Sequence, residues 1–227
     1  MTHLYIFDID GTLISAGGCG TLAINKVFEA RFGYENICQH LSFAGATDKD
    51  IFAKAQAIAA EASGVPPVSE ADIFQAYATS FERELQRDNT CRAYDGVVEL
   101  LEKLKRREDV ILGIGTGNLA ATAQLKLQYS GLDAYFTFGG YGSDHEQRSD
   151  IFQTSLSRGT AQLSQTPSRV IVFGDTPKDI WAAQAIGAEV VAVTTGTFDA
   201  PPLLQENPDL VVPALNTKEL FEFLRIT

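Results

Sequence analysis

The chain has 227 residues, of which 45% are hydrophobic and 21% are charged, and this composition is that of an ordinary globular protein. It excludes a disordered or fibrous chain, and the length allows one large domain or a core with a smaller module. The formal net charge is −11 without a long basic block, so nucleic acid and anionic membranes are not expected as partners.

The cysteines and the first residues of the chain bear on the compartment. Cys19, Cys38 and Cys91 are far apart and form no CxxC motif, which argues against a disulfide framework or a zinc site. The opening MTHLYIFDID lacks a basic region and is interrupted by Asp8, unlike a signal peptide. No apolar run approaches the roughly 18 residues of a membrane span. We therefore expect a cytoplasmic protein.

Five short apolar runs predict strands that are buried on both faces of a sheet. They lie at residues 4–7, 110–114, 169–173, 190–193 and 210–212. Helical patterns lie between them, including residues 97–104 and a helix that begins at Thr176 and Pro177 and stops at Gly187. This alternation predicts an α/β fold with a three-layer, Rossmann-like core and a mostly parallel sheet.

One interval departs from the alternation. Between the first two strands we find only helical patterns, at residues 23–32, 48–62 and 70–86. We interpret residues 15–94 as a small all-helical cap domain inserted into a catalytic core of residues 1–14 and 95–227. Glycines at both junctions could act as hinges. The alternative is a single domain with additional surface helices.

The first strand ends in the motif FDIDGT, residues 7–12. Because residues i and i+2 of a strand point to the same face, we expect the carboxylates of Asp8 and Asp10 to emerge side by side. Two such charges repel by several kcal/mol at an effective dielectric of about 20. A divalent cation with oxygen ligands would compensate this repulsion. The alternative is an Asp-Gly turn with a helix cap.

The second strand ends in GIGTGN, residues 113–118. Backbone N–H groups at the start of the following helix bind phosphate oxygens, and Thr116 adds a hydroxyl. The spacing does not fit a dinucleotide fingerprint, because the third glycine would fall at Asn118, and the P-loop lysine is missing. The alternative is that Asn118 only caps the helix.

Two further segments carry charged candidates. In GDTPKD, residues 174–179, Asp175 lies at the carboxyl end of a strand, the edge where open α/β sheets bind ligands. Asp179 falls in the first turn of the next helix, where it either caps the helix or supports a metal. Arg148 follows a predicted loop and is placed to bind phosphate, although an isolated arginine usually lies on a solvated helix surface.

In this order the four motifs resemble those of the haloacid dehalogenase superfamily of phosphohydrolases, and most closely its phosphoglycolate phosphatase-like branch. The resemblance implies that Asp8 is the nucleophile and Asp10 the acid/base. It implies that Mg²⁺ is held by Asp8, by the backbone carbonyl of Asp10 and by Asp175, with Asp179 in support. The residues implied to bind phosphate are Thr116, Gly117, Asn118 and Arg148, the last in place of the usual lysine.

We therefore expect a Mg²⁺-dependent phosphatase that hydrolyses a small phosphorylated metabolite, such as phosphoglycolate, a sugar phosphate or a nucleotide, through an aspartyl-phosphate. Loops 17–21 and 45–48 are expected to contact the leaving group. The resembling dehalogenases lack the second aspartate, so Asp10 argues against that activity. Open alternatives are a phosphonatase using Lys49, a phosphomutase, for which His40 is the only histidine in the cap, and a non-catalytic phosphate-binding module. The sequence predicts no oligomeric state.

Overall fold

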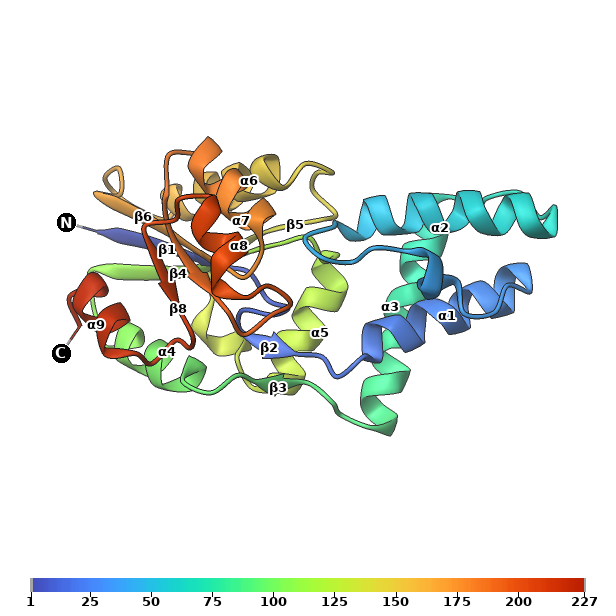
Figure 1. Ribbon diagram of the computed structural model, residues 1–227, viewed down its shortest axis with the longest axis horizontal. Coiled ribbons are helices and arrows are strands. Elements are labelled where there is room, and N and C mark those ends of the chain that lie inside the picture. Colours follow the sequence, from blue (N-terminus) through green and yellow to red (C-terminus); the bar gives the residue numbers. More distant parts are fainter. Residues whose placement is uncertain (1, 227) are drawn as a thin grey trace.

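The computed structural model describes residues 2–226 and contains a six-stranded parallel sheet (Figure 1). The order of its strands is β5-β4-β1-β6-β7-β8. They are β1 (His3–Phe7), β4 (Val110–Thr116), β5 (Phe138–Tyr141), β6 (Arg169–Gly174), β7 (Glu189–Val193) and β8 (Leu210–Val212). Residues 1 and 227, the outer ends of the predicted core, lie outside the described residues.

Helices cover both faces of this sheet. One face carries α6, α7 and α8, and the other carries α4, α5 and α9 (Figure 1). Alternate residues of β1 supply both interfaces: Leu4 and Ile6 belong to the first apolar core, and Tyr5 and Phe7 to the second. The bounds are α4 (Val97–Lys105), α5 (Ala120–Ser130), α6 (Arg148–Thr160), α7 (Pro177–Ala185), α8 (Ala200–Gln205), α9 (Lys218–Leu224) and the 3₁₀ turn η2 (Asp133–Tyr135). The predicted α/β fold is thereby confirmed.

The helical insertion lies beyond one end of the sheet (Figure 1). It comprises α1 (Cys19–Phe32), η1 (Ile37–His40), α2 (Asp48–Ser63) and α3 (Glu70–Arg87). Both connections to the core run side by side, because β2 (Ile14–Ser15) pairs antiparallel with β3 (Arg92–Ala93). This arrangement supports the proposed division into a core of residues 1–14 and 95–227 and a cap of residues 15–94.

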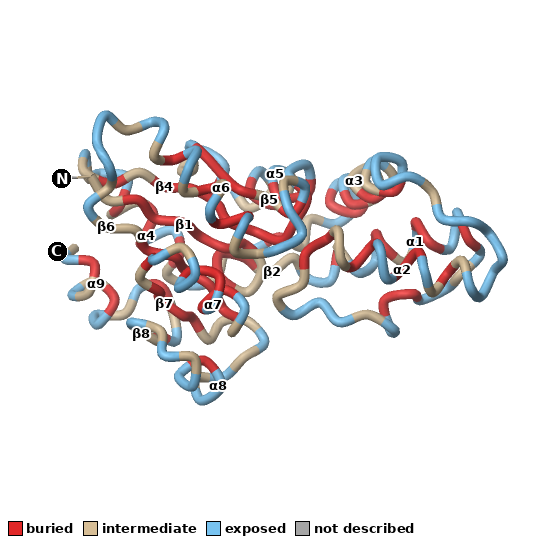
Figure 2. The backbone as a smooth tube through the Cα atoms, turned by 90° about the horizontal axis from the view of Figure 1, so that it is seen from above, coloured by how far each residue is buried: buried red, intermediate tan, exposed pale blue. Residues whose placement is uncertain are grey.

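The cap has an aromatic interior of its own. The ring of Phe52 stacks on Phe28 at 6.1 Å and lies 4.9 Å from the ring of Tyr77. Figure 2 shows buried backbone along α1, α2 and α3 as well as through the sheet. No helix within residues 2–226 is both long and apolar enough to cross a lipid bilayer.

Candidate active site

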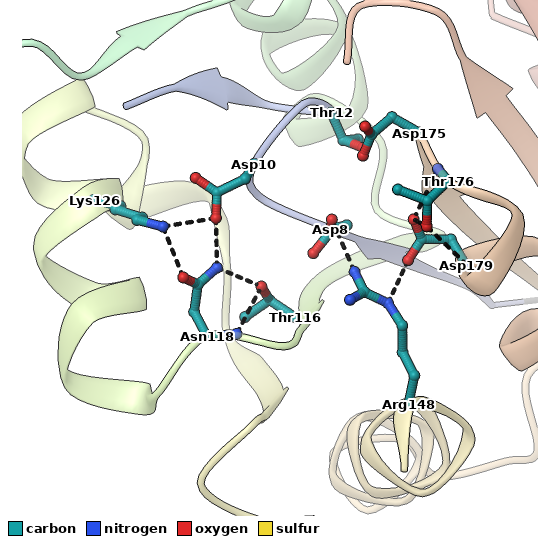
Figure 3. Close-up of polar contacts among 10 residues, drawn as sticks. All are labelled: Asp8, Asp10, Thr12, Thr116, Asn118, Lys126, Arg148, Asp175, Thr176 and Asp179. Atoms are coloured by element: carbon teal, nitrogen blue, oxygen red, sulfur yellow. Dashed lines mark hydrogen bonds and ion pairs between the residues drawn. The ribbon is translucent and has the colours of Figure 1, made fainter. Parts of the chain in front are cut away.

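Asp8 and Asp10 leave the end of β1 in different directions (Figure 3). Asp8 is buried, and its main-chain N–H donates to the carbonyl of Phe173 at 2.9 Å, which continues the pairing of β1 with β6. The Asp10 side chain is 45% exposed and contacts Asn118 and Lys126. The expectation that the two carboxylates lie side by side therefore needs correction: donors on α5 and on the loop before it hold Asp10 away from Asp8.

Three buried carboxylates gather at the ends of β1 and β6. Asp8, Asp175 and Asp179 each place one carboxylate oxygen within 4.8 Å of the others. Asp175 directly follows β6, and Asp179 lies in the first turn of α7, where it forms a capping box with Thr176. Within residues 2–226 the Asp10 side chain does not join this group. If Asp10 binds a metal ion here, it does so through its main-chain carbonyl, as we proposed from the sequence.

The glycine of the first motif permits the close approach of Asp175. Gly11 has a φ of +81°, a conformation that L side chains rarely adopt, and a Cβ there would lie 2.3 Å from Asp175 Oδ2. The Thr195 hydroxyl donates to the Gly11 carbonyl at 2.5 Å, and the Thr12 hydroxyl donates to Asp175 at 3.4 Å. The loop after β1 therefore packs directly against the loop after β6.

Arg148 compensates part of the negative charge of this group. It is the first residue of α6, and its guanidinium donates through Nε to Asp179 at 2.5 Å and lies 2.9 Å from Asp8 Oδ2 (Figure 3). Its side chain is only 9% exposed. A guanidinium has a planar arrangement of donors that is suited to carboxylates and to phosphate oxygens alike. The reading of Arg148 as a surface residue is excluded by this burial.

Burial has a large effect on the two strand-end carboxylates. Loss of solvent raises the pKa of Asp8 to about 7, although Arg148 opposes the shift and Asp179 adds to it. Loss of solvent, with Asp179 and Asp8 nearby, raises the pKa of Asp175 to about 8. One arginine therefore does not neutralise the group, and a further positive charge would stabilise its ionised form.

The second motif is tied to the first by a ring of hydrogen bonds. The Asn118 amide donates to Asp10 Oδ2 at 2.7 Å and to the Thr116 hydroxyl at 2.8 Å. Asn118 does not cap α5: the N-cap position is Leu119, which makes no side-chain cap hydrogen bond. Thr116, Gly117 and Asn118 all line the cavity described below. The structure thus brings these three predicted phosphate-binding residues to the edge where Asp8 lies.

Sequence reasoning missed Lys126, which contacts Asp10 and Asn118 directly. Its Nζ lies 2.6 Å from Asp10 Oδ2 and donates to Asn118 Oδ1 at 2.7 Å, and its side chain is 5% exposed. A signal was available, because Lys126 lies on the same helix face as Ala123 and Leu127, both of which are buried. A charged residue on the apolar face of a helix indicates a buried partner.

Asp48 was also missed as a contact between cap and core. Its N–H donates to the Gly117 carbonyl, and its carboxylate accepts from the Leu119 N–H, both at 2.8 Å. A Cβ on Gly117 would lie 2.6 Å from the carbonyl of Ala46, so a glycine is needed where the cap loop touches the second motif. Burial raises the pKa of Asp48 to about 6, with Lys126 opposing the shift. Asp48 is the first residue of α2, a position where acidic residues are common, so its sequence gave no sign of this contact.

A cavity of about 470 Å³ lies between cap and core. The core side is lined by the predicted site residues at the ends of β1, β4 and β6, including Asp8, Asp10 and Asp175. The cap contributes residues of both loops predicted to contact a leaving group, 17–21 and 45–48, together with Tyr77. The volume suits a small molecule, and the charged groups lie mainly on the core side.

The chain is similar in sequence and fold to known phosphatases and related proteins. A family model described as haloacid dehalogenase-like hydrolase matches residues 5–193. The chain is 27% identical to the phosphoglycolate phosphatase of Agrobacterium fabrum, covering 99% of this chain and 94% of that protein. It is 28% identical to that of Synechococcus elongatus, covering 90% and 89%. The crystal structure of CbbY from Rhodobacter sphaeroides in complex with phosphate matches with a TM-score of 0.74 at 18% identity, covering 95% of each chain.

Proposed function

Because the chain belongs to the haloacid dehalogenase-like hydrolase family, we propose that it hydrolyses a small phosphate monoester through a phosphorylated Asp8, with Mg²⁺ as cofactor. The family and the phosphoglycolate phosphatase relatives identify the chain as a phosphatase. The proposal of a phosphorylated Asp8 and a Mg²⁺ cofactor rests on the group of three buried carboxylates beside Arg148 at one edge of the sheet.

This group has the donor chemistry of a divalent cation site. Its oxygens are buried and close together, and the pKa values of Asp8 and Asp175 are raised because their ionised forms lack sufficient compensation. An all-oxygen donor set suits Mg²⁺. We propose Asp8, Asp175 and the Asp10 main-chain carbonyl as ligands, with Asp179 orienting them through Arg148. When bound, Mg²⁺ would offset the negative charge of the phosphate.

In the first half of the proposed reaction, an Asp8 oxygen attacks phosphorus in line. The bond from phosphorus to the ester oxygen breaks, and the Asp10 carboxyl gives its proton to the leaving oxygen. Thr116, the Gly117 N–H and Arg148 hold the remaining phosphate oxygens, on which charge accumulates. Arg148 already lies 2.9 Å from Asp8 Oδ2, so the nucleophile and the phosphate-binding cation are positioned together.

In the second half, water replaces the alcohol. Asp10, now a carboxylate, takes a proton from the water that attacks phosphorus, and the bond between phosphorus and Asp8 breaks. The products are inorganic phosphate and the regenerated Asp8 carboxylate. The different directions of Asp8 and Asp10 suit these two steps. One carboxylate bonds to phosphorus, while the other exchanges a proton with the leaving or the entering oxygen.

The named activities of the two relatives favour phosphoglycolate among small esters, with sugar phosphates and nucleotides as the other candidates. The phosphonatase and phosphomutase alternatives depend on residues that lie outside the cavity containing Asp8. Lys49, required for a phosphonatase, lines a neighbouring crevice beside Trp181, on the other side of the loop at Gly45 and Ala46. His40, the cap histidine considered for a phosphomutase, packs edge-on against Tyr34. Within residues 2–226 neither side chain lines the cavity that contains Asp8.

The first test is phosphate release from p-nitrophenyl phosphate and from a panel of metabolite esters that includes phosphoglycolate. We expect release with Mg²⁺, loss of release on addition of EDTA, and recovery when Mg²⁺ is supplied in excess, because the carboxylate group needs a cation to accept a phosphate dianion. Separate measurement of free and transferred phosphate distinguishes hydrolysis from a mutase reaction. Absence of release from every ester would refute the proposal.

A second prediction concerns stability as a function of pH. The folded-state pKa values of Asp8 and Asp175 lie above their unfolded value, so in EDTA the stability due to them falls as the pH rises from about 4 to about 8. Mg²⁺ competes with protons for the same carboxylates, so it should raise the melting temperature more at pH 8 than at pH 5. Thermal unfolding with EDTA or Mg²⁺ measures this difference, and the Asp175→Asn variant should lose most of it. An equal effect of Mg²⁺ at both pH values would contradict the prediction.

A further inference from the structure

Lys126 is a buried lysine whose ammonium is directed at the proposed acid/base (Figure 3). Its Nζ lies 2.6 Å from Asp10 Oδ2 and 2.7 Å from Asn118 Oδ1, while 5% of its side chain is exposed. Taking an ammonium out of water is costly unless it is paired and hydrogen-bonded. A lysine on a helix usually extends its charge to solvent, whereas the ammonium of Lys126 points inward to these two contacts.

The two donors that reach Asp10 contact the same oxygen. Asn118 Nδ2 and Lys126 Nζ both contact Oδ2, at 2.7 and 2.6 Å. Asn118 is fixed in turn, because its amide also donates to Thr116 and its Oδ1 accepts from Lys126. Within residues 2–226 both side-chain donors to Asp10 reach Oδ2, and none reaches Oδ1. One carboxylate oxygen is thus held by the protein, and the other is left to a ligand in the cavity that Asp10 lines.

The surroundings of Lys126 keep it charged. The Asp10 carboxylate lies 2.6 Å from Nζ and Asn118 Oδ1 accepts from it at 2.7 Å, and both contacts favour the ammonium form. Phe81 of α3 presents its ring 5.7 Å from Nζ, a favourable contact for a cation. Lys126 therefore connects the first motif, the second motif and the cap through a single positive charge.

We propose that Lys126 is the positioning residue of the acid/base, orienting Asp10 and stabilising the negative charge that develops on it as it protonates the leaving group. This inference rests on the proposed function, because it assigns a role within the first half of that reaction. When the Asp10 carboxyl gives up its proton, charge appears on a group whose Oδ2 lies 2.6 Å from an ammonium already in place. Lys126 acts through Asp10 and forms no bond to the reacting atoms.

The test compares two kinds of ester with the Lys126→Met variant. An alkyl phosphate needs a proton on its leaving oxygen, whereas p-nitrophenyl phosphate releases a stable phenolate without one. For such a two-step reaction kcat/KM reports phosphoenzyme formation. We expect kcat/KM for the best alkyl ester of the panel to fall at least about tenfold, and that for p-nitrophenyl phosphate to change less than about threefold, since general acid catalysis contributes about 10² to 10⁴. A structural role would lower both values equally.

Three matched variants complete the experiment. Lys126→Gln, which keeps a donor without the charge, should show the same dependence on the leaving group if the methionine variant folds poorly. Lys26→Met removes the cap ion pair with Glu84 and should leave both values unchanged. In an Asp10→Asn background, Lys126→Met should cause no additional loss with the alkyl ester. Equal losses with both esters, no loss with either, or a full additional loss in the double variant would overturn the inference. A wild-type protein inactive on every ester would instead refute the proposed function.

Discussion

Replacing Asp8 with asparagine is expected to lower phosphate release by about 10⁴-fold or more, because removal of a covalent nucleophile costs about 10⁶-fold in a well-studied hydrolase of another class. Asparagine has almost the same shape but cannot attack phosphorus as a carboxylate. The change also removes one of three buried carboxylates within 4.8 Å of one another, so the fold should be retained and the repulsion among them reduced. Phosphate release and thermal unfolding, measured on the same preparation, check both parts.

The Asp10→Asn variant is the matched control. It removes a proton donor and leaves the nucleophile, so turnover of an alkyl ester should fall about 10²- to 10⁴-fold. With p-nitrophenyl phosphate, whose leaving group needs no proton, the variant should still become phosphorylated and should hydrolyse the phosphoenzyme slowly. Intact-protein mass spectrometry detects the added phosphoryl group. Substantial activity in Asp8→Asn, or failure of Asp10→Asn to become phosphorylated, would exclude the proposed mechanism.

Arg148→Met is expected to have the second largest effect, on both activity and stability. The guanidinium is 9% exposed and contacts Asp8 and Asp179, so its removal leaves both buried carboxylates without the cation that they share. Breaking a buried ion pair by removing one partner costs about 3 to 5 kcal/mol in the free energy of unfolding. We also expect a loss of about 10²-fold or more in kcat/KM, because a preorganised charge that stabilises the transferring phosphoryl group is lost. Chemical denaturation and steady-state kinetics measure the two effects.

Arg148→Lys separates charge from geometry at the same position. A lysine keeps the positive charge but not the planar fork that reaches two carboxylates at once. We expect this variant to recover most of the lost stability and to retain activity within about tenfold of the wild type, since the resembling superfamily usually has a lysine here. If Arg148→Met remained as stable as the wild type but lost activity, Arg148 would serve the reaction alone; if it remained as active as the wild type, the proposed role of Arg148 in binding phosphate would be wrong.

The sequence was most informative where function coincides with the end of a strand. The apolar runs before Asp8, Thr116 and Asp175 predict parallel strands, and parallel strands bring their carboxyl ends to one edge. The sheet and the gathering of these residues could therefore be predicted without coordinates. The strand β5 could not, because its sequence FGGY contains two glycines in four residues and its pairing with β4 depends on tertiary packing.

The directions of individual side chains were harder to predict. Alternation along a strand places Asp8 and Asp10 on one face, but the backbone leaves the strand after Phe7, so that rule no longer applies at Asp10. The position of Asp10 is instead set by Lys126, which is 116 residues away in the sequence. A contact of this kind depends on how α5 packs, and a single sequence carries no measure of that. The local sequence gave one indication of this contact, which is that the charged Lys126 lies on the apolar face of α5.

The central place of β1 has a consequence for how the protein is made. Within residues 2–226, His3 of β1 pairs with Val110 and Arg169, so β1 waits roughly a hundred residues for the earliest strand that it pairs with. At about 5 to 20 residues per second, the ribosome needs on the order of 5 to 20 seconds to deliver it. The cap helices, which pack mainly on one another within residues 15–94, can fold in that interval, while the nascent apolar segment of β1 stays unpaired and open to chaperones. Assembly of the sheet is therefore non-local, and the catalytic edge can form only after β6 and the start of α7 have been synthesised.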